Sequence, residues 1–176
     1  PNINNGLGGA LDIRKGRVEE TDTNFISNGS TFGVSGTLKM AAGTAYKITK
    51  ASASNIDSEY IPRFFKMELA GGEIELASAG NQFLRPSIAY HNLAFTNTGA
   101  KSLVGSASVA NLTRVTGGSL NILATADNAS AIILTAKKGL QNTGGTIIFE
   151  NNAQLLQDTD AANIGNIQSQ RLASNI

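Results

Sequence analysis

The sequence predicts an all-β fold, and within this class a right-handed parallel β-helix (a solenoid) of about six coils. Two observations predict it. A pattern of two glycines followed by alternating apolar residues occurs four times, and each copy is typical of a turn that leads into a short strand with one apolar face. Similar strands also recur at a fixed interval, since Leu11 and Leu38, Leu93 and Leu120, and Leu120 and Ile147 are each related as i and i+27.

The four copies begin at Gly8, Gly71, Gly117 and Gly144, and a degenerate fifth copy begins at Gly36. In a parallel β-helix, equivalent strands of successive coils stack, and their apolar side chains form ladders inside the coil. We expect two such ladders: one through Leu11, Leu38, Ile74, Leu93, Leu120 and Ile147, and one through Ile13, Met40, Leu76, Phe95, Ile122 and Phe149. At roughly 4.8 Å per coil, six coils give a rod about 30 Å long. The alternative is an antiparallel β-sandwich, in which the glycine pairs would close hairpins.

Composition supports one β-rich domain. The 176 residues can bury a substantial core, so residues 1–176 are expected to form a single β-solenoid domain. Only 15% of the residues are charged, and a net charge of +1 gives no footprint for nucleic acid or an anionic membrane. The chain has no cysteine, which excludes disulfides and thiolate metal sites. No apolar run approaches the roughly 18 residues of a membrane span, so no membrane insertion is expected.

Short strands are expected in order along the chain, separated by Gly, Asn and Ser turns. They cover residues 11–13, 38–40, 46–48, 64–69, 74–76, 91–95, 147–149 and 155–156. The mixed-sign stretch 14–20 is expected to be a solvated face. The run 131–135 is the most apolar in the chain and is expected to be fully buried.

One interval departs from the period. Leu38 and Ile74 are related as i and i+36 instead of i and i+27, and the extra chain is assigned to a loop over 51–63 that protrudes from one coil. Binding residues concentrate on loops held by a rigid scaffold. The candidate binding residues are therefore Asp57, Glu59, Tyr60 and Arg63. A tolerated insertion without a role is the alternative.

No catalytic residue, cofactor or metal site is predicted. The single histidine, His91, has no cysteine to share a zinc ion with and is expected to be a surface or ladder residue. Asp158 and Asp160 lie close together in the chain and are weak candidates for a calcium site, for which a polar turn is the alternative. Glu73 and Glu75 share one face of a strand, an arrangement compatible with the carboxylate pair of a glycosidase, but the outward face of a coil accounts for them as well.

Three stretches of the second half resemble coils of large secreted surface proteins of the Bacteroidota. Residues 89–99 are similar to their F-x-N-L-x-φ-x-x-x-G coil, and 139–157 to their N-x-G-x-φ-x-φ-x-x-x-A-x-L-φ-Q coil. Residues 163–171 resemble the N-x-G-N-I-x-x-x-R segment that follows. Such proteins often leave the cell through the type IX secretion system and act as adhesin-like modules. Their C-terminal sorting domain has no counterpart in this chain.

The resemblance implies an extracellular or cell-surface module of a larger bacterial protein, acting as a stalk or binding scaffold rather than as an enzyme. Its implied partners are other domains of the same polypeptide, cell-surface components and glycans. The chain begins at Pro1 without an initiator Met, and we expect it to be a processed product or an excerpt.

Two alternatives remain open. Parallel β-helices also include polysaccharide lyases and hydrolases, which need a groove of clustered charges and aromatic rings. This chain has no Trp and three Tyr. A subunit that polymerises end to end through its open coil edges is the other alternative.

Overall fold

The computed structural model describes residues 9–21, 36–52, 60–123, 132–150 and 153–157. These ranges contain eighteen short strands and no helix. The described residues therefore include no helix that could cross a membrane. Every strand pairing within them is parallel. The parallel β-helix is therefore confirmed, and the antiparallel sandwich is wrong.

The strands form four sheets, which we call A to D. Sheet A contains β1 (Ala10–Ile13), β3 (Thr37–Met40) and β6 (Lys66–Glu68). Sheet B contains β2 (Arg17–Glu20), β4 (Ala45–Ile48), β7 (Glu73–Leu76), β10 (Asn92–Phe95), β13 (Thr113–Val115) and β16 (Leu140–Asn142). Sheet C contains β5 (Tyr60–Ile61), β8 (Gln82–Leu84), β11 (Ala100–Leu103), β14 (Ser119–Leu123) and β17 (Thr146–Glu150). Sheet D contains β9 (Ala89–Tyr90), β12 (Ala107–Val109), β15 (Ile133–Ala136) and β18 (Gln154–Gln157).

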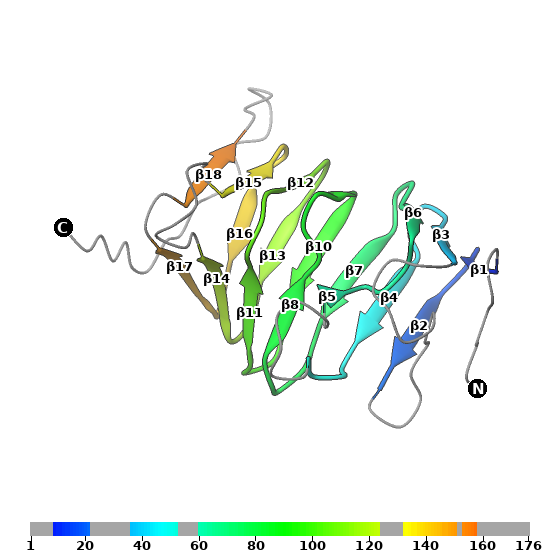
Figure 1. Cartoon of the computed structure of the whole chain (residues 1–176), viewed down its shortest axis with the longest axis horizontal. Coiled ribbons are helices and arrows are strands. Elements are labelled where there is room, and N and C mark those ends of the chain that lie inside the picture. Colours follow the sequence, from blue (N-terminus) through cyan, green and yellow to red (C-terminus); the bar gives the residue numbers. More distant parts are fainter. Residues whose placement is uncertain (1–8, 22–35, 53–59, 124–131, 151–152, 158–176) are drawn as a thin grey trace.

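The chain visits the sheets in a repeating order. Each coil passes through sheet A or D, then sheet B, then sheet C, so A and D hold the same place in successive coils. We call the strands of one coil a rung. Figure 1 shows the rungs stacked side by side along the long axis, from β2 at one end to β16 toward the other. Sheet B has six strands in the described ranges, in agreement with the six coils expected.

The core lies inside the coil and is built by alternation, because every second side chain of a strand points inward. In sheet B the inward positions form two ladders. The first runs through Tyr46, Ile74, Leu93, Thr113 and Leu140, and the second through Ile48, Leu76, Phe95 and Val115, all buried. Stacking like side chains on successive rungs removes apolar surface from water at every step along the axis.

The two ladders expected from sequence are each divided among three sheets. Leu38 stacks on Leu11 in sheet A, Ile74 on Leu93 in sheet B, and Leu120 on Ile147 in sheet C. The neighbour of Leu93 on the next rung is Thr113 and not Leu120. The interval from Leu93 to Leu120 therefore joins two different sheets, and the prediction of continuous ladders is wrong.

The coil length varies along the molecule. In sheet B, Glu73 pairs with Ala45 on the preceding rung, so these neighbours are related as i and i+28. On the following rung Glu73 pairs with Asn92, a relation of i and i+19. The pairing of Thr113 with Leu140 returns to i and i+27. The rung repeats, whereas the turns between its strands differ in length.

Two local predictions are corrected. Glu20, expected on a solvated face, ends β2 with its side chain inside the coil and only 5% exposed. The run 131–135 is not fully buried, since Ile133 and Thr135 of β15 alternate with buried Leu134 and lie half-buried on the outer surface. Both follow from the alternation of a strand, which fixes which side chains turn inward regardless of their polarity.

Candidate functional site

The candidate binding loop is described only in part. Asp57 and Glu59 lie outside the described residues, as do Asp158 and Asp160. Tyr60 belongs to β5 and pairs with Phe83 of β8, so it is part of sheet C and the prediction that it lies in a protruding loop is corrected. Arg63 follows shortly after β5 and is half-buried. The structure thus places Tyr60 in sheet C and Arg63 in the segment between β5 and β6.

The outer face of sheet B carries the carboxylates Glu73 and Glu75. Arg114 Nη2 lies 2.5 Å from Glu73 Oε2, and Arg17 Nη2 lies 2.5 Å from Glu75 Oε2. Each arginine spans one intervening rung, β10 or β4, to reach its partner on β7. The Thr96 hydroxyl also donates to Glu75 Oε1 at 2.9 Å. The two carboxylates are thus held in ion pairs that tie five rungs together.

The interior of sheet C contains a buried cation. Lys101 of β11 is fully buried, and its Nζ donates to the carbonyl oxygens of Ser78 and Gly99, each at 2.8 Å. These carbonyls belong to the turns that join sheets B and C on two adjacent rungs. Burial lowers the pKa of Lys101 to about 8, because the ammonium has left water without gaining a counter-charge.

Gln82 occupies the rung before Lys101 and acts in the same way. Its Nε2 donates to the carbonyls of Ile48 at 2.9 Å and Lys50 at 2.8 Å, and its Oε1 accepts from Ser78 N at 3.1 Å. Gln82 and Lys101 therefore bind backbone groups of Lys50, Ser78 and Gly99 where the coil turns a corner between sheets B and C. Their role in the described structure is to join rungs.

A second buried polar pair lies near the start of the coil. The Tyr46 hydroxyl donates to Glu20 Oε2, and both side chains are buried. Burial raises the pKa of Glu20, opposed by this hydrogen bond and by the charges of Lys50 and Arg63. Burial also raises the pKa of Tyr46. The pair is enclosed by the coil, with the Phe64 ring packed edge-on against Tyr46 at a centroid distance of 6.1 Å.

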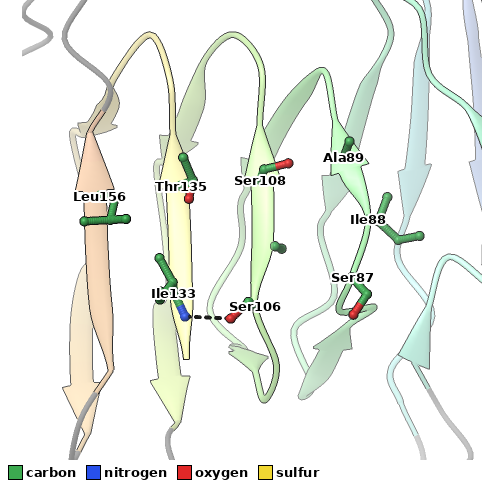
Figure 2. Close-up of a pocket in the computed structure, with 9 residues that line it drawn as sticks. Ser87, Ile88, Ala89, Ser106, Ser108, Ile133, Thr135 and Leu156 are labelled. Atoms are coloured by element: carbon green, nitrogen blue, oxygen red, sulfur yellow. Dashed lines mark hydrogen bonds between the residues drawn. The ribbon is translucent and has the colours of Figure 1, made fainter. Parts of the chain in front are cut away.

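The outer face of sheet D is hollowed into an open groove of about 430 Å³, which we call the sheet D groove. It is lined by Ser87, Ile88, Ala89, Ser106, Ala107, Ser108, Ile133, Thr135 and Leu156. Figure 2 shows Leu156, Thr135, Ser108 and Ala89 in a row across four strands, with Ile133, Ser106 and Ser87 in a second row. Stacking in register explains this order, since the residues of the first row pair with one another from strand to strand.

Neither Lys101 nor the sheet D groove is predicted from the sequence. Lysine is rarely buried, so the apolar pattern does not assign Lys101 to the core. The sequence nevertheless carries a signal for burial. Lys101 and Leu103 are two residues apart, as are the inward-facing pairs Gln82 and Leu84 on the preceding rung and Leu120 and Ile122 on the next rung of sheet C. The described residues that line the groove are neither charged nor aromatic, so their sequence resembles that of ordinary strands.

Across the described part of the chain, no group of three or more His, Asp or Glu side chains could hold a metal ion. His91 lies half-buried in the bend before β10, and its carbonyl accepts from Asn111 N at 2.9 Å. No protein-family model matches the chain, and comparisons with curated proteins and with solved structures find no match either.

Proposed function

We propose that this chain is a structural, adhesin-like module of a larger secreted or surface-anchored bacterial protein, in which the stacked coils act as a stalk or binding scaffold. The observation that carries the proposal is the ion-paired outer face of sheet B. Glu73 and Glu75 are the strongest acid–base candidates of the sequence, and each is held by an arginine from two rungs away.

A hydrolytic pair needs one carboxylic acid and one carboxylate with separated pKa values, facing a substrate across a cleft. Here each carboxylate is engaged by a guanidinium on the same outer face, Glu73 by Arg114 and Glu75 by Arg17. Pairing across rungs instead suits a load-bearing role, because separating the rungs breaks these contacts. The polar bonds of Lys101 and Gln82 inside the coil support the same role.

The purified chain should release no reducing ends above the buffer control when it is incubated with a panel of neutral and acidic polysaccharides. A Glu73→Gln/Glu75→Gln double variant serves as the matched control. Product release by the native chain that this double variant loses would contradict the structural proposal and favour a carbohydrate-active enzyme. Filaments in electron micrographs of the same sample would instead favour the end-to-end assembling subunit.

A further inference from the structure

We propose that the sheet D groove is a binding site for a neutral oligosaccharide. The inference rests on the proposed scaffold function and adds to it a location and a class of ligand. The groove spans β9, β12, β15 and β18, so a ligand in it would lie across four successive rungs and run along the solenoid axis (Figure 2).

The charge of the surface selects a neutral ligand. None of the described residues that line the groove is charged. The outer face of sheet A, which holds the same place in the earlier coils, carries the ion pairs Lys39–Glu68 and Lys66–Glu68. Sheet B carries those of Glu73 and Glu75. The change from a charged to an uncharged outer face therefore occurs between β6 and β9, and a charged ligand would gain nothing at the groove.

The groups that line the groove match the two kinds of surface on a sugar. A pyranose ring offers hydroxyls at its edge and C–H groups on its faces. In the part of the chain that the structure describes, the hydroxyls of Ser87, Ser108 and Thr135 have no protein partner, and Ser106 Oγ accepts from Ile133 N at 3.0 Å. Beside these hydroxyls lie the aliphatic side chains of Ile133, on the same strand as Thr135, and of Leu156, on the neighbouring strand β18 and 48% exposed (Figure 2).

The size of the groove suits a small ligand better than a second copy of the chain. Four strands lie about 4.8 Å apart, and the segments of β9, β12 and β15 each present two outward residues roughly 7 Å apart while β18 presents Leu156, so the groove covers on the order of 100 Å². A stable protein interface needs about 800 Å² on each partner. A volume of about 430 Å³ lies instead within the range of small-molecule sites. A segment of a few sugar units fits this space, and the regular strand spacing suits a ligand that itself repeats.

The test follows amide chemical shifts of the ¹⁵N-labelled chain during titration with cellotetraose and maltotetraose as neutral probes and tetragalacturonate as an anionic probe. We expect at least one neutral probe to bind with a dissociation constant on the order of 1 mM, with shifts concentrated in β9, β12 and β15. Thr135→Asp should weaken that binding at least tenfold by placing a carboxylate in the middle of the groove.

Thr146→Asp is the matched control, because Thr146 is exposed on the outer face of β17 in sheet C. It should leave the affinity unchanged within twofold. If Thr135→Asp does not fold, Ser108→Asp on the neighbouring rung provides the same test. Failure of both neutral probes to bind, equal binding of the anionic probe, or native affinity in the folded groove variant would overturn the site. The polysaccharide assay tests the scaffold proposal independently, so a negative result in this titration would overturn the binding site without contradicting the scaffold proposal.

Discussion

Gly99→Ala is expected to destabilise the protein by about 3 kcal/mol or more, because an added Cβ makes a closer contact here than at the other described glycines. Gly99 lies in the turn from sheet B to sheet C, directly against the same turn of the preceding rung. A Cβ at this position would come within 2.0 Å of the Gly80 carbonyl oxygen and 2.8 Å of the Ala79 carbonyl carbon. These atoms are backbone, so relief requires the two rungs to separate.

Gly16→Ala separates this steric effect from backbone strain. Gly16 has a φ of 74° and no atom within 4 Å of an added Cβ, so its substitution should cost only the left-handed conformation, roughly 1–2 kcal/mol. Urea unfolding of both variants measures the difference. If Gly99→Ala proves no more destabilising than Gly16→Ala, the close contact between rungs at this corner is contradicted.

Stability is expected to rise by about 2 kcal/mol between pH 8 and pH 10 because of Lys101. Below pH 8 the lysine is protonated in both the folded and the unfolded chain, and the full cost of burying its charge is present. The pKa is about 8 in the folded protein and 10.5 in the unfolded chain, so between these values the unfolded chain holds a proton that the folded chain has lost. Stability therefore rises with pH in this window.

The rise should end near pH 10. Tyr46 and Tyr90 are buried with raised pKa values, so ionisation of the unfolded tyrosines then begins to favour unfolding. Urea unfolding at pH 7, 8, 9 and 10 measures the profile. Lys101→Met keeps a long unbranched side chain and removes the titration, and its profile should be flat relative to the native protein. A native rise that persists in Lys101→Met would assign the effect to another group.

The fold class could be predicted from sequence because a solenoid repeats a local pattern. The turn after Gly8-Gly9 and the apolar alternation of Leu38 and Met40 each identify a strand without knowledge of its partners. The pairing of strands could not be predicted in the same way. Leu93 and Leu120 have the same spacing and similar surroundings as true neighbours, yet they belong to different sheets, because the coil that begins at Leu93 returns to sheet B at Thr113, after 20 residues instead of 27.

The glycine pairs are ambiguous for a related reason. They occur where adjacent rungs approach closely at a corner, and the coil has more than one corner. Gly71-Gly72 leads into β7 of sheet B, whereas Gly117-Gly118 and Gly144-Gly145 lead into β14 and β17 of sheet C. The glycine pattern indicates that a small residue is needed at a corner of the coil. It does not indicate which of the corners the glycine pair occupies.

The surface features could not be predicted from sequence because each depends on stacking. Glu73 meets Arg114 only because the parallel register places β13 two rungs from β7 on the same face of sheet B. Ser108, Thr135 and Leu156 form a row only when coils of unequal length come into register. Such groups gather residues that lie far apart in the chain and share no motif.

The central claim is that each coil is an independent rung of one stacked scaffold, and duplication of a single coil tests it most directly. A second copy of residues 113–139 inserted after Gly139 adds one turn and places Leu120 on Leu120, without stacking a second lysine on Lys101. Small-angle X-ray scattering should show a folded protein whose maximum dimension has grown by about 4.8 Å. A duplicated chain that is unfolded, or folded with an unchanged length, would contradict the account.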